Sequence, residues 1–297
     1  MSDTTKTNEK QVKHPAKYTN SFIPIFAEKL RDSKNVIDIF AGTCKISKIK
    51  EYGYRGKIYC NELEKEWAEQ GLGQVDAITT MDAEFLPYKD GFFDAICTSP
   101  TYGNRMADHH KAKDGSRRNT YTHTIGRDLT EGNTGKMQWG TEYKQKHISI
   151  WKEAYRILKV GGILILNTSD HIRKGEVISV SEWHKDTLIS LGFNLQEEIK
   201  VETPRLRYGA NANKRVDYEY IHVFSKPSCA VIQSDSKDTL SVLANLKNLV
   251  WESDYLGSEI GFPQSSVVGM YTKSESDGEY NYYIDAEKRE LLDIWKS

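Results

Sequence analysis

The chain has 297 residues, a formal net charge of −1 and 38% hydrophobic residues, enough for one large domain or for one domain with a small appendage. The near-neutral charge favours no class of partner, so only local charge patterns are informative. Four scattered cysteines without a CxxC pair exclude a zinc or disulfide framework. Because no apolar run could span a membrane or form a signal peptide, we expect a soluble, cytoplasmic protein without a metal site.

The order of the predicted elements indicates an α/β fold. Residues 1–13 are polar and charged, which is typical of a disordered tail. Apolar runs predict buried strands at 35–40, 57–61, 76–80, 93–98, 163–167 and 216–224. Amphipathic or apolar segments predict helices at 18–30, 147–158 and 182–191. Strands that alternate with helices and end in polar loops predict a doubly wound, mostly parallel sheet.

The strand at 93–98 runs directly into Ser99, Pro100, Thr101 and Tyr102. Such a strand places its following loop at the carboxyl edge of the sheet, where α/β proteins bind ligands. The Ser99 hydroxyl and the Pro100 carbonyl can accept hydrogen bonds from an exocyclic amine, and Tyr102 can stack on a nucleobase. We therefore take these four residues as catalytic candidates, with an ordinary turn as the alternative.

Three other strand ends carry residues suited to a nucleoside. Gly42 lies in the turn after the first strand, which ends at Asp38, while Glu62 and Asp82 follow the second and third strands. An acid after the second strand can bind ribose hydroxyls, and Asp82 can accept from an adenine amino group. Neither GxGxxG nor a GK[ST] motif follows the first strand, so S-adenosylmethionine fits better than a dinucleotide or a nucleotide. The alternative is that these acids only cap helices.

The motifs at residues 38–43, Glu62, Asp82 and residues 98–102, in that order, resemble the S-adenosylmethionine-dependent DNA amino-methyltransferases, the cytosine-N4 and adenine-N6 enzymes of restriction–modification systems and phages. Further stretches look similar to this family and extend the resemblance over about residues 13–225: 14–18, 102–109, 158–162, 167–173 and 207–212. The resemblance implies a class I methyltransferase, Rossmann-like fold for residues 14–225, with a small C-terminal appendage.

The resemblance also implies a set of cofactor-binding residues: Pro15, Lys17, Tyr18, Asp38, Phe40, Ala41, Gly42, Thr43, Glu62, Asp82 and Ala83. Two positions depart from the family pattern. Thr101 replaces the usual second Pro of the tetrad, and Cys44 replaces a second Gly of the turn. Ser99 in first place, rather than Asp, favours cytosine N4, and adenine N6 remains open.

Residues 103–147 form a long polar insertion in which basic residues outnumber acidic ones. We expect this insertion to contact DNA phosphates, with a solvated lid as the alternative. The candidate contacts are Asn104, Arg105, Lys111, Lys113, Arg117, Arg118 and Arg127.

Residues 226–297 are more acidic and richer in Ser and Tyr, so we place a domain boundary near Pro227. Within them, residues 255–268 have a glycine turn followed by a serine that can cap a helix, which favours a helical or helix-turn-helix-like module. Its acidic charge disfavours phosphate contact, so sequence recognition and packing or dimerisation stay as alternatives.

The sequence thus predicts a site-specific DNA methyltransferase with S-adenosylmethionine as cofactor and double-stranded DNA as partner. Methylation of RNA and a DNA-binding regulator with a degenerate methyltransferase domain are the alternatives. The target sequence, a restriction endonuclease partner and the oligomeric state stay open.

Overall fold

The computed structural model of the protein describes residues 12–15, 19–104, 120–203 and 216–227, and three further strands at 232–234, 269–273 and 280–285. The chain divides into two compact units, residues 1–226 and 227–297. Among the described helices, none has the length and apolar composition that a membrane crossing requires.

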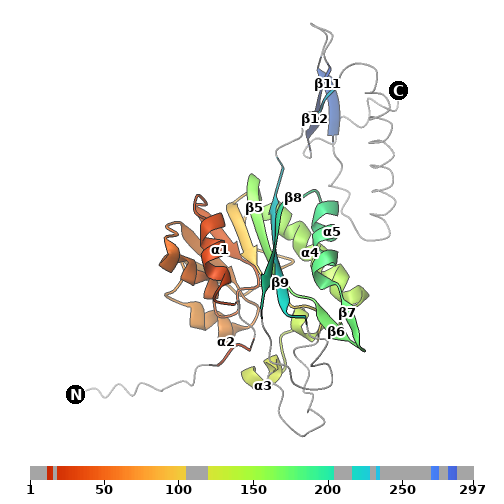
Figure 1. Ribbon diagram of the computed structural model, residues 1–297. Helices are drawn as coiled ribbons and strands as arrows, with labels where there is room; N and C mark the ends of the chain where they lie inside the picture. The colour runs from red at the N-terminus through yellow and green to blue at the C-terminus, as the bar shows by residue number, and fades with distance from the viewer. Residues whose placement is uncertain are drawn as a thin grey trace, which may run out of the picture. The chain divides into compact units, whose positions relative to one another are not determined.

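The first unit is built around a seven-stranded sheet in the order β3-β2-β1-β4-β5-β9-β8 (Figure 1). The strands from β3 to β5 pair in parallel, whereas β9 pairs antiparallel with both β5 and β8. The strand order reverses between β1 and β4, so the sheet is doubly wound, as predicted. The strands are β1 (Asn35–Asp38), β2 (Lys57–Asn61), β3 (Ala77–Thr79), β4 (Phe93–Thr98), β5 (Leu158–Thr168), β8 (Asn194–Glu202) and β9 (Tyr218–Ser225).

Helices cover both faces of this sheet (Figure 1). One face carries α1 (Phe22–Lys29) and the 3₁₀ helix η1 (Lys45–Tyr52), and the other carries α4 (Thr141–Ile157) and α5 (Val180–Ser190). The shorter elements are α2 (Lys65–Ala68), η2 (Glu69–Gly71), α3 (Tyr121–Ile125), η3 (Thr134–Lys136), and the hairpin strands β6 (His171–Arg173) and β7 (Glu176–Ile178).

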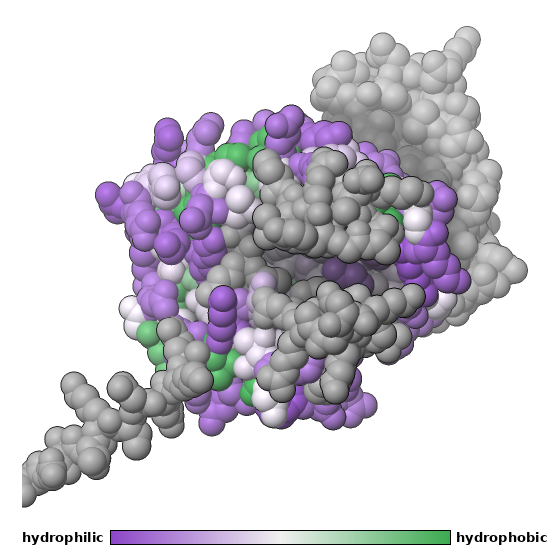
Figure 2. Space-filling view, turned by 60° about the horizontal axis from the view of Figure 1, so that its bottom comes forward, coloured by the Kyte–Doolittle hydropathy of each residue, from purple (hydrophilic) through white to green (hydrophobic). Residues whose placement is uncertain are grey.

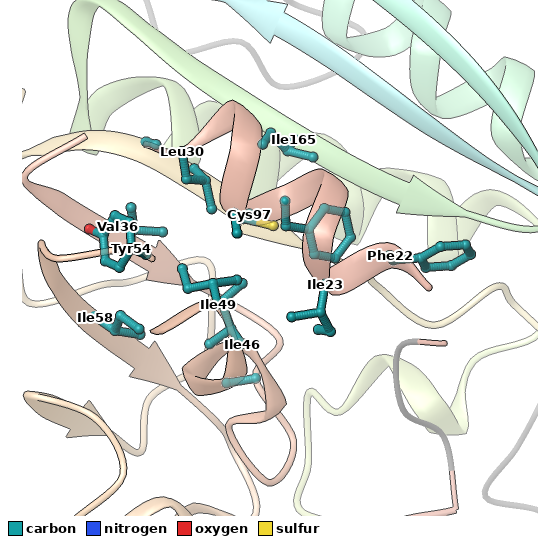
Figure 3. Close-up of a cluster of buried hydrophobic side chains, with 14 of the residues drawn as sticks. Phe22, Ile23, Leu30, Val36, Ile46, Ile49, Tyr54, Ile58, Cys97 and Ile165 are labelled. Carbon is teal, nitrogen blue, oxygen red and sulfur yellow. The ribbon is translucent and has the colours of Figure 1, made fainter. Parts of the chain in front are cut away.

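Alternating strand residues supply two hydrophobic cores. On β1, Val36 packs into the cluster with α1, shown in Figure 3, while Ile37 packs into the cluster with α4. On β4, Cys97 packs into the cluster with α1 and Ile96 packs into the cluster with α4. Because both faces of these strands are buried, their sequences are continuous apolar runs rather than alternating ones.

Two aspartates tie the central strands together at opposite ends. At the carboxyl end, Asp38 Oδ1 accepts a hydrogen bond of 2.7 Å from the Thr98 hydroxyl, which joins β1 to β4. At the amino end, Asp94 accepts from the backbone N–H of Asn35 at 2.8 Å and from Lys159 Nζ at 2.6 Å. These contacts fix the relative position of the loops that follow β1 and β4.

Most predicted elements differ from the observed ones by a few residues at their ends, and the largest differences are at α4 and β5. The helix predicted at 147–158 is α4, which begins at Thr141, and the strand predicted at 163–167 is β5, which begins at Leu158 and includes Gly161 with φ +75°. The amides of Gly161 and Lys226 pair with backbone carbonyls across the sheet. Strand β8 was not predicted, because its side chains are largely exposed and polar.

The described part of the second unit is a three-stranded antiparallel sheet in the order β10-β12-β11. Its strands are β10 (Ile232–Ser234), β11 (Gly269–Lys273) and β12 (Tyr280–Asp285). The sequence-based expectation of a helical module did not include this sheet. The predicted helix-turn-helix segment, 255–268, lies outside the described residues.

Candidate active site

A cavity of about 470 Å³ lies at the carboxyl ends of the parallel strands. Seen from the side of α3, the described surface of the molecule is mainly hydrophilic, with small separate hydrophobic patches (Figure 2). Most of the predicted site residues line this one cavity: Pro15, Phe40, Ala41, Gly42, Thr43, Glu62, Asp82, Ala83, Ser99, Pro100, Thr101, Tyr102 and Asn104. Lys17 and Tyr18 lie outside the described residues.

The turn after β1 is shaped by two left-handed residues. Gly42 has φ +54°, and a Cβ atom on it would lie 3.1 Å from the imidazole of His14, which also lines the cavity. Cys44 has φ 57° without being glycine, at the position where the family usually has Gly. Its Sγ lies 2.3 Å from where a Cβ of Gly71 would be, so Gly71 makes room for the cysteine. The cysteine thus adopts a left-handed conformation that glycine reaches more easily, and its side chain is accommodated against Gly71.

Glu62 joins this turn to the end of β2. Its Oε2 accepts from the Gly42 N–H at 2.8 Å, and its Oε1 accepts from the Glu64 N–H at 2.9 Å. Burial raises the pKa of the Glu62 carboxyl to about 7, although both backbone N–H groups act to lower it. The carboxyl group faces the cavity and still has acceptor capacity for a ligand hydroxyl.

Asp82 is hydrogen-bonded from α4 and from its own loop, and the insertion approaches it closely at Gly132. Its Oδ2 accepts from Lys146 Nζ of α4 at 2.6 Å, and its Oδ1 accepts from the Glu84 N–H at 3.2 Å. Gly132 has φ +82°, and a Cβ atom there would lie 2.4 Å from Asp82 Oδ2. Only glycine therefore allows the insertion to approach this carboxylate.

Asp38 does not belong to the cavity lining among the described residues. It is buried, and its Oδ1 accepts from the Phe40 N–H at 3.0 Å as well as from Thr98. With these contacts Asp38 shapes the turn and ties β1 to β4, and its direct contact with the cofactor stays a prediction.

The loop after β4 presents its four residues to the cavity. The hydroxyls of Ser99 and Tyr102 lie 3.2 Å apart. The Thr101 hydroxyl donates to Thr134 Oγ1 at 2.8 Å, and the Thr101 carbonyl accepts from the Tyr143 hydroxyl at 2.5 Å. The residue that replaces the family's second Pro is thus bonded through both its side chain and its backbone.

The described part of the insertion folds back on the cavity. Buried Glu64 accepts from the Thr130 N–H, the Asn133 side chain and Arg127, all at 2.7 to 2.8 Å. Arg127 also pairs with Glu66 at 2.6 Å. The partly exposed Arg127 guanidinium is thus paired with two carboxylates of the protein, and its contact with DNA stays a prediction.

The other predicted DNA contacts divide between described and undescribed residues. Asn104 lines the cavity and forms a backbone bridge with Gln138. Arg105, Lys111, Lys113, Arg117 and Arg118 lie outside the described residues.

Many of the cavity residues were not predicted from the sequence, and four of them have polar groups placed to bind a ligand or one another. Trp67 of α2 has a buried indole N–H without a hydrogen-bond partner, and Thr203, after β8, has a buried hydroxyl in the same state. Asn167 of β5 donates to Glu219 of β9 at 3.1 Å. Asn167 lies at the end of an apolar strand as Asp38 does, so its position could have been used to predict it as a site residue. Trp67 could not be predicted, because its surroundings in the sequence are those of an ordinary core residue.

The strand order and the cavity at its carboxyl edge define the Rossmann-like fold of class I methyltransferases. A family model of N6 and N4 methyltransferases, described as DNA methylase, matches residues 93–296, and the chain belongs to this family. The match includes the Ser99–Tyr102 loop but begins after Gly42, Glu62 and Asp82. As in this family, S-adenosylmethionine is the cofactor.

Three solved structures illustrate the similarity, each at low sequence identity. The PH0226 protein from Pyrococcus horikoshii OT3 is 14% identical, with a TM-score of 0.43, 69% of this chain covered and 87% of that one. A SAM-dependent methyltransferase from Methanosarcina mazei is 14% identical, with a TM-score of 0.45 and coverages of 69% and 97%. The N-methyltransferase NodS from Bradyrhizobium japonicum WM9 is 9% identical, with a TM-score of 0.44 and coverages of 70% and 94%. None of the curated proteins matches the chain.

The residues present fit the cofactor. The cavity volume falls within the usual range of small-molecule sites, and its lining is mixed polar and apolar. The unpartnered Trp67 N–H supplies a donor, and Glu62 supplies an acceptor beside the Gly42 turn. A nucleoside with hydroxyl, amine and carboxylate groups uses both kinds of partner.

Proposed function

We propose that this protein transfers a methyl group to the exocyclic amine of a flipped base in DNA, with cytosine N4 as the favoured target. The observation that carries the proposal is that Ser99 and Tyr102 line the same cavity as Gly42 and Glu62. A methyl donor held at the glycine turn and an amine held at the catalytic loop then share one cavity. Holding two reactants in a productive geometry can supply about 7–11 kcal/mol of the rate enhancement.

The catalytic loop provides acceptors for the amine. An exocyclic amine is a weak nucleophile because its lone pair is delocalised into the ring. Hydrogen bonds from its two N–H groups to Ser99 Oγ and the Pro100 carbonyl favour a more tetrahedral nitrogen with a localised lone pair. S-adenosylmethionine supplies the methyl group as an electrophilic sulfonium, and the surplus amine proton can leave to solvent afterwards.

Tyr102 would hold the flipped base by stacking. Stacking of a base on an aromatic side chain is worth about 1–3 kcal/mol, which offsets part of the cost of removing the base from the duplex. The hydroxyl of Tyr102 lies near Ser99, so the same ring would also orient the first amine acceptor.

The cofactor would lie along the turn after β1. Glu62 is placed to accept from the ribose hydroxyls, and Asp82 to accept from the adenine amino group. Phe40, Ala41 and Thr43 would contact it through the turn, and Pro15 and Ala83 complete the described contacts of this proposal.

The test is methyl transfer from radiolabelled S-adenosylmethionine to unmodified duplex DNA, followed by nucleoside analysis. We expect labelled N4-methylcytosine. Labelled N6-methyladenine would keep the enzyme class and overturn the choice of base. If DNA stays unlabelled while the cofactor binds, transfer or ribosomal RNA becomes the acceptor to test. Failure to bind the cofactor would favour a regulator with a degenerate domain.

A further inference from the structure

A line of three buried side chains leads from the helical layer to the catalytic loop. The indole N–H of Trp151 on α4 lies 3.0 Å from His184 Nδ1 on α5. His184 Nε2 lies 2.9 Å from the Tyr143 hydroxyl, which lies 2.5 Å from the Thr101 carbonyl. Trp151, His184 and Tyr143 are each 0% exposed. The line therefore joins the protein interior to the backbone between Pro100 and Tyr102 without contact with solvent.

The chemistry of these groups fixes the direction of every bond. An indole N–H can only donate, so His184 Nδ1 accepts and carries no proton. A neutral imidazole then carries its proton on Nε2, which donates to the Tyr143 oxygen. The Tyr143 hydroxyl is left to donate to the Thr101 carbonyl, which can only accept. No bond in the line can reverse while Trp151 is present.

The surroundings keep this imidazole neutral. Burial, with smaller contributions from His147 and His222, holds the pKa of His184 well below its usual range. A fully buried line whose bonds are all satisfied is expected to be rigid, because breaking any one bond would leave a buried polar group unpaired.

We propose that Trp151, His184 and Tyr143 act together as positioning residues that hold the Thr101 carbonyl. The proposal rests on the proposed function, since Pro100 and Tyr102 flank this carbonyl and would bind the target base. Holding Thr101 fixes the direction of the Pro100 carbonyl and the plane of the Tyr102 ring relative to the methyl donor. None of the three positioning residues belongs to the cavity lining among the described residues.

Tyr143→Phe removes the hydroxyl, and with it the bonds to His184 and to the Thr101 carbonyl, and keeps the ring. We expect kcat to fall about tenfold, because displacing the catalytic loop raises the activation free energy by more than the lost hydrogen bond is worth. The Kd of S-adenosylmethionine should stay unchanged. The matched control is Tyr54→Phe. Tyr54 is 1% exposed, and its hydroxyl donates to the Lys57 carbonyl at 3.1 Å, outside the cavity. Tyr143→Phe should lose more thermal stability than Tyr54→Phe, because it also leaves the buried His184 Nε2–H unpaired, and only Tyr143→Phe should lose turnover.

Replacements of His184 test the direction of the line. His184→Gln keeps a donor near the position of Nε2 and should retain more of kcat than His184→Leu. In the wild type, imidazole ¹⁵N chemical shifts should show His184 protonated on Nε2 alone. A proton on Nδ1, or equal turnover for Tyr143→Phe and Tyr54→Phe, would overturn the proposal.

Amide hydrogen exchange separates this proposal from the proposed function, because it needs no methyl transfer. Tyr143→Phe should speed exchange across residues 99–103 relative to Tyr54→Phe, even if the wild type methylates neither DNA nor RNA. A wild type without transfer would contradict the proposed function alone. Unchanged exchange across 99–103 would contradict the positioning role alone.

Discussion

The hydroxyls of Thr101 and Thr134 are hydrogen-bonded at 2.8 Å, which connects the catalytic loop to the insertion that covers the cavity. Proline at position 101 would restrict the loop through its ring, and threonine instead restricts it through this bond. Thr134 lines the cavity and follows Asn133, which is bonded to buried Glu64. Thr101 in place of proline thus replaces the rigidity of a proline ring with a hydrogen bond to a residue distant in sequence.

Removing this contact should slow catalysis. Thr101→Val deletes a hydroxyl–hydroxyl bond worth about 0.5–1.5 kcal/mol, so we expect kcat to fall up to about tenfold. Thr134→Val should have a similar effect, and the double variant should be no worse than either single one. Thr187→Val on α5, outside the cavity, is the control and should leave kcat unchanged. Additive losses in the double variant would show that the two hydroxyls act separately.

Changes at Tyr102 should separate stacking from hydrogen bonding. Tyr102→Ala removes the ring and should weaken binding of DNA that carries an extrahelical target base by about 1–3 kcal/mol. Tyr102→Phe keeps stacking and loses the contact with Ser99, so it should lower kcat while the Kd of DNA stays near that of the wild type. Fluorescence anisotropy and single-turnover kinetics measure the two effects. Unchanged turnover for Tyr102→Ala would contradict the stacking role.

Cofactor binding should depend on pH through Glu62. Its pKa is about 7 in the free protein, against an ordinary value of 4.5, so the carboxyl is protonated at pH 5 to 6. Ribose hydroxyls that donate to the carboxylate favour the ionised form, so binding should release a proton below pH 7. The Kd of S-adenosylmethionine should therefore tighten up to about tenfold per unit as the pH rises toward 7, and level off above it.

The raised pKa of Glu62 affects the pH dependence of folding stability in the opposite direction. Because the folded-state pKa is raised, Glu62 favours the folded state most below pH 4.5, and this contribution is lost as the pH rises through 7. Glu62→Gln should remove both dependences. Calorimetry in buffers of different ionisation enthalpy measures the released proton, and equal proton release in Glu62→Gln would exclude this residue as its source.

Arg127 should matter for stability rather than for DNA. Arg127→Ala leaves buried Glu64 with one partner fewer and should lower the melting temperature. The slope of log Kd for DNA against log salt should stay unchanged, because each phosphate contact that is lost lowers it by nearly one. Arg55→Ala, which removes a guanidinium bonded only to backbone carbonyls among its described contacts, is the control for surface charge. A reduced slope for Arg127→Ala alone would instead support Arg127 as a DNA contact.

The central strands could be predicted from the sequence because burial on both faces makes them apolar throughout. Strand β2 was predicted with its boundaries as observed, and β4 ends where its apolar run ends. Strand β8 could not be predicted, since it is an edge strand with exposed charged residues such as Glu197 and Glu202. Its stability comes from pairing with β9, a contact that no local pattern encodes.

The site could be predicted where function follows directly from a strand end. Ser99, Glu62 and Asp82 each follow a strand, and parallel strands bring their carboxyl ends to one edge. Trp67 and Glu219 could not be placed there, because α2 and β9 reach the cavity only through tertiary packing. Asp38 also lies at a strand end, but its carboxylate is hydrogen-bonded to Phe40 and Thr98 and does not line the cavity among the described residues.

The hydrogen bonds of Asp38 and Asp94, which join β1 to β4 at both ends, also affect how this enzyme could change its target during evolution. Since both ends of the β1–β4 pair are secured, the turn that faces the methyl donor and the loop that faces the amine cannot drift apart by small steps. We expect adaptation to a new base to occur at the neighbouring part of the cavity lining, through Asn167, Thr203 and Glu219, while the tied strand pair is inherited as one unit.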